Sequence, residues 1–218
     1  MAILDVLLPP SCAGCGRYGS AICGPCRQTF RRLGGQGLLA PDPGVLVGDA
    51  CSVAVAAFAH EEAIQRVLRR LKYGSGARLA TPLADLAQPA LRKLLRETGS
   101  AVLVPIPLHE ERRRDRGYNQ AALLAQRLAQ RTETALWSGL TRRRATARQH
   151  GLDRVTRLRN LCDAMAIGRA PPPTALAQMT VVLVDDILTT GATLEASAGV
   201  LRAAGVNAVY GFAIAREV

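Results

Sequence analysis

Two adjacent acids, Asp185 and Asp186, stand where a run of β-forming residues meets a loop rich in threonine and glycine. The run is Val181-Val182-Leu183-Val184, and the loop covers residues 189–193. Neighbouring carboxylates repel each other unless a ligand uses them, and ligands of open α/β sheets bind at the carboxyl ends of strands. The two hydroxyls of a ribose can each donate a hydrogen bond to a carboxylate. We therefore expect the acid pair to bind a ribose diol.

The loop after the acids has the composition of an anion site. Its residues are Thr189, Thr190, Gly191, Ala192 and Thr193, and they open the helical pattern of residues 192–204. A helix N-terminus presents unpaired backbone N–H groups and a positive dipole end, and glycine lets the backbone approach a phosphate closely. A 5′-phosphate therefore fits here, while the absence of a GK[ST] sequence excludes a Walker-type loop. The alternative is an N-capped helix after a strand that carries two solvated acids.

Four of the six cysteines form two CxxC pairs separated by seven residues: Cys12, Cys15, Cys23 and Cys26. Four thiolates complete the tetrahedral shell of Zn²⁺ and leave no open position, so we expect one structural zinc ion in a small N-terminal ribbon. A redox-active dithiol and an iron–sulfur cluster are the alternatives. The other two cysteines, Cys51 and Cys162, lie in apolar patterns and are interpreted as core residues.

The charge of the chain is strongly basic and consists almost entirely of arginine. The net charge is +11, and only two of the 28 basic residues are lysines, Lys72 and Lys93. Residues 105–160 hold 13 arginines against five acids. Because the guanidinium group is a planar fork of donors that matches phosphate oxygens, we expect an anionic partner. A solvated charged face is the alternative for this stretch.

Apolar patterns place these motifs in an α/β fold. They predict strands over residues 51–59, 101–104, 135–137, 180–184 and 206–215, and helices over 61–72, 82–97, 119–131, 151–162 and 192–204. Strands that alternate with helices indicate a parallel sheet flanked by helices. A segment rich in glycine and proline divides the chain into a zinc-ribbon module (1–32), a linker (33–50) and a main domain (51–218).

Targeting and spanning segments are not evident in the sequence. It contains no basic region followed by a cleavage site, and no apolar run reaches about 18 residues. We therefore expect a cytoplasmic protein without a membrane span. In that reducing compartment cysteines serve as metal ligands or core residues more often than as disulfides.

The string VVLVDDILTTGAT resembles the signature of type I phosphoribosyltransferases. The resemblance implies Mg²⁺-dependent binding of phosphoribosyl diphosphate (PRPP) or another 5′-phosphoribosyl compound. The resemblance implies that Asp185 and Asp186 are the acids of the catalytic site and bind the ribose hydroxyls. It also implies that the loop from Thr189 to Thr193 binds the 5′-phosphate, with magnesium bridging ribose and diphosphate. Catalysis would come from positioning and charge neutralisation as diphosphate leaves, without a protein nucleophile.

Further motifs narrow the resemblance to the ComF/GntX branch. Its members carry a four-cysteine zinc ribbon before a phosphoribosyltransferase-like domain and are associated with DNA uptake in competence. The motifs are Leu71-Lys72-Tyr73-Gly74, Val104-Pro105-Ile106-Pro107-Leu108, Arg116-Gly117-Tyr118-Asn119-Gln120, and a group formed by Arg144, Thr146, Gln149, Arg157 and Asn160. The resemblance covers nearly the whole chain, but it implies no particular acceptor substrate.

Several residues of these motifs are expected to contact PRPP: Pro105, Ile106, Arg116, Asn119 and Gln120. The first two fall where the family has its diphosphate loop, and the others combine charge with amide donors. The cluster 112–116 is interpreted either as a flap that closes over the diphosphate, with Gly117 as its hinge, or as an exposed basic patch. Tyr118 either stacks on a base or covers the core.

Two functions are consistent with the sequence. The first is transfer of phosphoribose between PRPP and an unknown acceptor. The second is a non-catalytic role in DNA uptake, in which the arginine-rich surface binds single-stranded DNA or the site binds a phosphoribosyl ligand. The low aromatic content of 4% limits base stacking and weakens the second function. A zinc-ribbon adaptor that binds another DNA-uptake protein is compatible with either.

Overall fold

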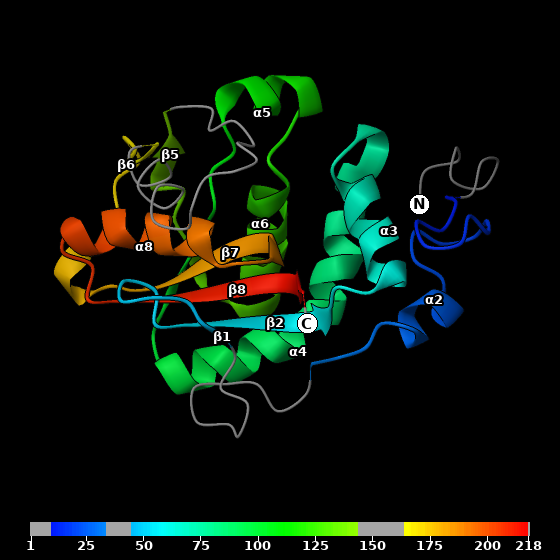
Figure 1. The fold of residues 1–218 in the computed structure, drawn as a ribbon, viewed down its shortest axis with the longest axis horizontal. Coiled ribbons are helices and arrows are strands. Elements are labelled where there is room, and N and C mark those ends of the chain that lie inside the picture. The colour runs from blue at the N-terminus through cyan, green and yellow to red at the C-terminus, as the bar shows by residue number, and fades with distance from the viewer. Residues whose placement is uncertain (1–9, 34–44, 144–163, 218) are drawn as a thin grey trace.

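A six-stranded sheet with helices on both faces forms the body of the protein (Figure 1). The computed structural model describes residues 10–33, 45–143 and 164–217. The strand order is β1 (Val45–Leu46), β2 (Val53–Ala59), β8 (Ala208–Arg216), β7 (Thr180–Leu188), β3 (Val102–Pro105) and β4 (Ala135–Leu136). Neighbouring strands pair in parallel, except that β1 pairs antiparallel with β2 at one edge. The predicted parallel sheet flanked by helices is confirmed.

The central strands are buried on both faces. Every residue of β2 is buried, as are Val181 to Val184 of β7. The strand predicted over 51–59 is present as β2, and it is buried throughout because helices cover both sides of a parallel sheet and leave no solvent-facing side. Alanine fills many of these positions, since close helix–sheet packing leaves room only for small side chains.

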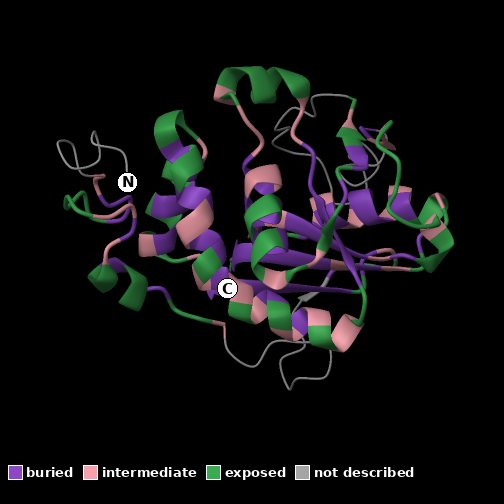
Figure 2. Ribbon diagram, turned by 180° about the vertical axis from the view of Figure 1, so that it is seen from behind, coloured by how far each residue is buried: buried purple, intermediate pink, exposed green. Residues whose placement is uncertain are grey.

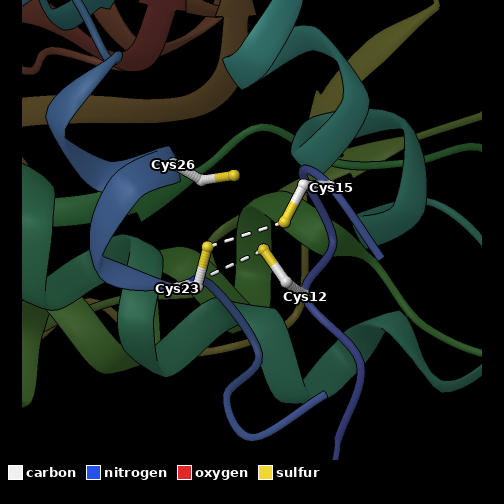
Figure 3. A group of neighbouring side chains, drawn as sticks. All are labelled: Cys12, Cys15, Cys23 and Cys26. Carbon is white, nitrogen blue, oxygen red and sulfur yellow. Dashed lines mark hydrogen bonds between the residues drawn. The ribbon is translucent and has the colours of Figure 1, made fainter. Parts of the chain in front are cut away.

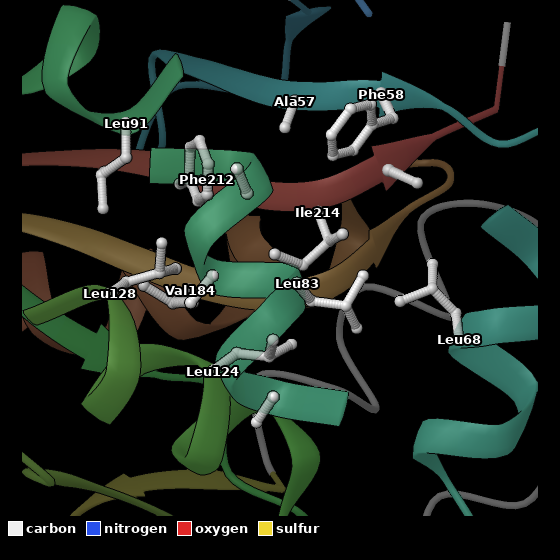
Figure 4. Packing of buried hydrophobic residues seen from close by; sticks show 14 of the residues in the cluster. Ala57, Phe58, Leu68, Leu83, Leu91, Leu124, Leu128, Val184, Phe212 and Ile214 are labelled. Atoms are coloured by element: carbon white, nitrogen blue, oxygen red, sulfur yellow. The ribbon is translucent and has the colours of Figure 1, made fainter. Parts of the chain in front are cut away.

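The first face of the sheet packs against α3 (Glu62–Leu71), α4 (Ala80–Thr98) and α6 (Gln120–Thr132). Figure 4 shows leucines of α4 and α6 meeting Val184 and Phe212 from the strands. Val182 and Val184 belong to this cluster, whereas Val181 and Leu183 belong to the cluster on the other face. Val182 and Val184 therefore point toward α3, α4 and α6, and Val181 and Leu183 point toward the opposite face. Beyond the acids this parity does not hold, because Leu188 belongs to the second cluster and Ile187 packs against the first.

The second face packs against α8 (Ala192–Ala203) and a small hairpin of β5 (Leu140–Arg142) and β6 (Met165–Ile167). Glu195 in the first turn of α8 accepts hydrogen bonds from the backbone N–H groups of Ala50 and Cys51, at 3.0 and 2.9 Å. The chain that follows β1 is thereby attached to the start of α8. Buried Cys51 is a core residue, as expected, while Cys162 lies outside the described residues.

The N-terminal cysteine segment includes the short helix α2 (Gly24–Gln28) and packs directly on the main body. Ile22 and Phe30 belong to the same apolar cluster as the first face of the sheet, and the Phe30 ring meets Phe58 edge to face at 5.5 Å. After α2 the chain runs beside β2, where Leu33 N–H donates to the Ala57 carbonyl. Within the stretch expected to be a linker, Val45 and Leu46 form the edge strand β1.

The expected helices α3, α4, α6 and α8 begin and end within two residues of their predicted bounds. The helix expected over 151–162 lies outside the described residues. Sequence patterns missed α5 (Glu110–Arg116), the β5–β6 hairpin and two 3₁₀ turns, η1 (Gly74–Leu79) and η2 (Leu176–Gln178). Within the described part of the chain, no helix is long and apolar enough to cross a membrane.

Candidate functional site

β7 does not end before the acid pair, as the sequence suggested, but continues through it to Leu188. Asp185 pairs with Ala213 of β8, and the ladder extends to Leu188 opposite Arg216. The two carboxyl groups stay close to each other, because, besides burial, the charge of Asp186 and a side-chain hydrogen bond between them both contribute to the raised pKa of Asp185. Asp186 lies next to the end of α3 and the start of α6. The Asp186 N–H donates to Asp185 Oδ1 at 2.8 Å, which holds the first acid against the strand end.

Asp186 is almost completely buried, with 4% of its surface exposed. Lys72, the residue directly after α3, brings its Nζ to 2.6 Å from Asp186 Oδ2. This contact is an ion pair without the alignment of a hydrogen bond. Gln120, the first residue of α6, donates from Nε2 to Asp186 Oδ1 at 3.4 Å. Both carboxylate oxygens of Asp186 are therefore contacted by the protein itself.

Asp185 lies in a less favourable electrostatic environment. Burial and the neighbouring Asp186 charge raise its pKa well above the ordinary value, and the more distant Lys72 ammonium opposes this only in part. Arg142 of β5 lies near it: burial and the charge of Arg112 lower the pKa of the Arg142 guanidinium, while Asp185 raises it. Asp185 therefore interacts electrostatically with Arg142 of β5, whose pKa also responds to Arg112.

The expected diphosphate loop lies beside the acid pair. Pro105 is the last residue of β3 and pairs in register with Val184, and the N–H of Ile106 donates to the Val184 carbonyl at 2.9 Å. Asn119 donates from Nδ2 to the Ile106 carbonyl, and its Oδ1 accepts from Ala121 N–H as the N-cap of α6. The amide of Asn119 is thus occupied in joining the loop to the helix, which is a structural task.

Arg116 and Gln120 extend this arrangement toward α5. The Arg116 Nη1 donates to Gln120 Oε1 at 2.5 Å, and its guanidinium lies over the Tyr73 ring, 5.6 Å from the centroid. Tyr118 neither stacks on the site nor only covers the core: its hydroxyl donates to the Leu71 carbonyl at 2.6 Å, and burial raises its pKa. The Arg116 motif and the Lys72 motif are therefore in direct contact.

The cluster expected to be a flap forms the short helix α5, and all its residues are exposed or half-buried (Figures 1 and 2). Glu110 and Glu111 lie in its first turn and arginines lie in its last, which complements the helix dipole. Glu110 accepts two hydrogen bonds from Arg113, both at 2.8 Å. Gly117, the expected hinge, ends the helix with φ +83°, a conformation in which glycine is favoured.

The phosphate loop has the predicted position between β7 and α8. Thr189 and Thr190 are exposed, and the Thr190 hydroxyl oxygen accepts a weak hydrogen bond of 3.5 Å from Ala192 N–H. Gly191 has φ +75°, and a Cβ there would meet the Val47 side chain at 2.8 Å. The backbone N–H groups at the start of α8, including those of Ala192 and Thr193, therefore open next to a glycine that no larger residue can replace without strain.

The four cysteines converge at the N-terminal end of the protein (Figure 3). Their Sγ atoms all lie within 4.8 Å of one another, and Cys15 and Cys23 are 3.6 Å apart. Zn–S bonds of about 2.3 Å in a tetrahedron place sulfurs about 3.8 Å apart, so the spacing suits a structural metal such as zinc. Backbone N–H groups of Gly14 and Cys23 point at the Cys12 sulfur.

The electrostatics of the cluster favour a cation. Burial raises the pKa of Cys12, but hydrogen bonds from backbone N–H groups outweigh this and lower it to about 6. Burial and the three neighbouring thiols raise the pKa of Cys26 to about 12. Without a cation one thiolate is therefore stabilised while another thiol is held protonated, and a bound metal ion would stabilise all four as thiolates.

A cavity of about 630 Å³ lies beside the acid pair, at the carboxyl ends of β2, β7 and β8. Its lining residues are Arg31, His60, Glu61, Gln65, Arg69, Lys72, Ile187 and Glu217. An Arg31–Glu61 ion pair of 2.5 Å crosses it, and His60 lies 3.9 Å from Glu217. Lys72 lies between this cavity and Asp186, because its side chain lines the cavity and contacts the Asp186 carboxylate.

Sequence reasoning missed two residues of the acid-pair site. Lys72 was noted only as part of a motif, and Arg142 only as part of the basic excess. Their contacts join residues far apart in the chain, so no local pattern signals them. The group Arg144, Thr146, Gln149, Arg157 and Asn160 lies outside the described residues.

A parallel sheet whose strand β7 carries two acids into a Thr-Thr-Gly loop, together with a four-cysteine module, defines a type I phosphoribosyltransferase-like α/β protein. No protein-family model matches the sequence. Similar curated proteins nevertheless agree on a narrower group, because their names refer to competence and to DNA utilization.

Three of these relatives match most of the chain. Competence protein F of Haemophilus influenzae is 28% identical over 95% of this chain and 85% of its own length. The DNA utilization protein YhgH of Escherichia coli K12 is 34% identical over 70% of this chain, and the match spans 66% of that protein, just under two thirds. Competence protein ComFC of Bacillus subtilis is 28% identical over 94% of this chain and 78% of its own length.

Among solved structures, a hypoxanthine phosphoribosyltransferase from Staphylococcus aureus is similar with a TM-score of 0.35 and 16% identity. The match covers 62% of this chain and 61% of that one.

Proposed function

We propose that the protein binds PRPP or another 5′-phosphoribosyl compound at the carboxyl end of β7 and transfers phosphoribose to or from an acceptor. The observation that carries the proposal is the sequence Asp185-Asp186 on a central strand, followed directly by the Gly191 turn and the N-terminus of α8. This arrangement offers carboxylates to ribose hydroxyls and backbone N–H groups to a 5′-phosphate at adjacent positions. The loop after Pro105 runs alongside and supplies a second backbone edge for the diphosphate.

Mg²⁺ is proposed to accompany the diphosphate at Asp185. The donor set suits it, because Mg²⁺ prefers carboxylate and phosphate oxygens and keeps several waters. Burial and Asp186 raise the pKa of Asp185, so a nearby cation would favour the carboxylate. When bound, the ion would neutralise charge on the leaving diphosphate. Besides burial, the charges of Arg112 and Asp185 both affect the pKa of Arg142, and guanidinium groups of this kind can bind phosphate oxygens.

The acceptor is proposed to occupy the cavity behind Lys72. Its volume of about 630 Å³ is within the range of small-molecule sites, and it opens at the same sheet edge as the acid pair. Its lining is rich in charged groups and holds one aliphatic side chain, Ile187. A polar acceptor with hydrogen-bonding groups fits this lining better than an apolar one.

Substitutions on the two halves of the site test the proposal. Asp185→Asn and Thr190→Ala should each weaken PRPP binding, measured by calorimetry with Mg²⁺, by about 1.5–3 kcal/mol, or roughly ten- to hundredfold. Thr174→Ala, at an exposed loop position away from the site, is the control and should bind normally. If the wild-type protein binds no 5′-phosphoribosyl compound, the proposal is wrong.

Ligand analogues separate the two contacts. A ligand without the 5′-phosphate should make Thr190→Ala silent and leave the Asp185→Asn effect intact. A 2-deoxyribose ligand should reduce only the Asp185→Asn effect. A screen of metabolites for diphosphate release would then identify the acceptor, while binding without any release would favour a non-catalytic role.

The cysteine cluster is proposed to hold one structural Zn²⁺ through Cys12, Cys15, Cys23 and Cys26. Metal analysis of the purified protein should find close to one equivalent, and a Cys12→Ser/Cys26→Ser variant should lose it. The matched control is Cys51→Ser, which removes a cysteine outside the cluster. Less than about half an equivalent in the wild type, or zinc retained in the double variant, would contradict this assignment.

A second candidate function is handling of single-stranded DNA. The names of the relatives refer to competence and DNA utilization, and the net charge of +11 favours a polyanionic partner. The likeness to these relatives and the basic composition support this candidate. Arg112 belongs to both candidate functions, so a phosphoribosyl ligand and single-stranded DNA would compete for part of the surface.

A further inference from the structure

Four side chains, together with Asp186, form a closed ring of contacts. Lys72 contacts one carboxylate oxygen at 2.6 Å, and Gln120 donates to the other at 3.4 Å. Gln120 accepts in turn from Arg116, whose guanidinium lies over the ring of Tyr73. Tyr73 is the neighbour of Lys72 in sequence, so the chain of contacts returns to its starting point. The ring joins the end of α3, the start of α6 and the last residue of α5 to one buried carboxylate.

A second contact keeps Lys72 in place. The carbonyl of Leu71, the residue just before it, accepts the hydrogen bond of the Tyr118 hydroxyl at 2.6 Å. The residues on both sides of Lys72 are therefore attached to the α5–α6 connection. Lys72 is 25% exposed in its side chain, whereas the Asp186 side chain is 6% exposed. The anchored backbone therefore fixes the direction from which the Lys72 ammonium group approaches the Asp186 carboxylate.

The burial of Asp186 requires such a partner. A buried charge without a partner is strongly unfavourable, and a carboxylate with free rotation would not present fixed oxygens to a ligand. Lys72 supplies the opposite charge, and Gln120 supplies a directional amide. Lys72 also acts on the other acid, because its ammonium group partly offsets the rise in the pKa of Asp185.

We propose that Lys72 is a positioning residue of the acid pair, which fixes the Asp186 carboxylate and, through Gln120 and Arg116, links its orientation to the basic helix α5. This inference rests on the proposed phosphoribosyl site. A movement of α5 would shift Arg116, Gln120 and the carboxylate together. The two motifs around Lys72 and Arg116 are thereby explained as the two sides of one ring.

Affinity for PRPP tests the role of Lys72. Lys72→Met should weaken binding at least about tenfold, and Lys72→Arg, which keeps the charge, should restore most of it. Lys93→Met is the matched control, because Lys93 is the only other lysine, lies on α4 and has no ion-pair partner among the described residues. Normal binding by Lys72→Met, or an equal loss in Lys93→Met, would overturn the proposal.

A double-mutant cycle separates positioning from direct ligand contact. If Lys72 acts through Asp186, adding Lys72→Met to Asp186→Asn should cause no further loss of affinity. Full additivity would mean that Lys72 contacts the ligand independently, and the proposal would be wrong. Where Asp186→Asn binds too weakly to measure, the same cycle is run on melting temperature, where the two single effects should again fail to add.

A ligand-free measurement keeps this inference distinct from the proposed function. With only two lysines in the chain, the side-chain nitrogen resonances can be assigned by substitution. The Lys72 ammonium should show slow hydrogen exchange that is lost in Asp186→Asn and weakened in Gln120→Ala, while the Lys93 signal is unchanged. Rapid hydrogen exchange of the Lys72 ammonium group in the wild type would contradict the ion pair and overturn the proposal. A wild type that keeps the ion pair but does not bind PRPP would instead contradict only the proposed function.

Discussion

The two acids of the site are chemically unequal although they are neighbours. Asp186 has a cation and an amide on its two oxygens, whereas Asp185 accepts only from a backbone N–H among the hydrogen bonds of the described residues. The residue that follows α3 and the first residue of α6 create this difference, because Lys72 and Gln120 both contact Asp186. Asp186 is therefore the fixed member of the pair. Asp185 is the member whose charge a ligand would stabilise.

Asp185→Asn should stabilise the ligand-free protein at neutral pH. Because burial and Asp186 raise the folded-state pKa of Asp185, the folded chain binds more protons than the unfolded chain between the two pKa values. Stability should therefore fall as pH rises from about 4 through the folded-state pKa, and the penalty is complete above it. Asparagine removes the charge and keeps an oxygen that can accept from Asp186 N–H.

The measurement is melting temperature against pH for wild type and Asp185→Asn. At pH 7 the variant should melt at least about 2 °C higher, which corresponds to roughly 1 kcal/mol for a chain of this size, and the difference should shrink toward pH 4. A variant that melts lower than wild type at pH 7 would show that Asp185 is stabilising without ligand.

At the scale of elements, α3 connects the cysteine module to the acid pair. Its exposed side reaches the module, where Arg66 donates to the Gly14 carbonyl at 2.9 Å and Arg70 donates to the Cys12 carbonyl at 3.2 Å. Its end leads into Lys72, which contacts Asp186. Arginine is suited to the first task, because a guanidinium group can bind a backbone carbonyl while its stem packs along the helix.

Removing these two anchors should loosen the metal site. Arg66→Ala/Arg70→Ala loses two hydrogen bonds worth about 0.5–1.5 kcal/mol each, so a chelator should remove zinc at least about fivefold faster. Arg69→Ala is the control on the same helix, because no hydrogen bond or ion pair of its side chain is found among the described residues. Equal rates in all three proteins would show that apolar packing alone holds the module.

The elements that sequence predicted well are those with long, regular apolar patterns. α3, α4, α6 and α8 each bury a stripe at helical spacing, and β7 and β8 are continuous apolar runs, so local composition was sufficient. The acid pair and the glycine loop directly follow one of these apolar runs, so the run also indicated their place in the fold. α5 was missed because it has no core face: it buries no residue, and its helix is favoured by end charges and Gly117 instead.

The contacts that define the site could not be predicted in the same way. The Lys72–Asp186 ion pair and the approach of Arg142 to Asp185 depend on how α3 and β5 are placed around the sheet. β7 extends through Asp185 and Asp186 because it pairs with β8 there, and these hydrogen bonds stabilise strand structure in residues that have low strand propensity. Tertiary pairing outweighs local preference at these positions.

At the scale of the whole molecule, the net charge of +11 sets the long-range field that a partner meets first. The exposed helix α5 contributes several arginines to it, although Glu110 forms ion pairs with Arg113 and Arg114. Exposed ion pairs of this kind are weak and screened by salt, so a polyanion can displace them. The arginine-rich stretch 105–160 therefore remains the expected contact region for single-stranded DNA, with its part beyond residue 143 outside the described residues.

If single-stranded DNA binds this region, its affinity should depend steeply on salt and little on base sequence. Each phosphate neutralised contributes about −0.7 to the slope of log affinity against log salt, so three or more contacts give a slope of about −2 or steeper.

Arg112→Ala/Arg114→Ala should lower both the affinity and the steepness of this slope. Lys93→Ala/Arg96→Ala removes the same charge from a different helix, α4, and should change the slope less. Fluorescence anisotropy with an unstructured oligonucleotide between about 50 and 200 mM salt measures these slopes. A flat dependence in the wild type would exclude phosphate contacts as the basis of binding, and equal effects of the two variants would mean that net charge acts without a localised site.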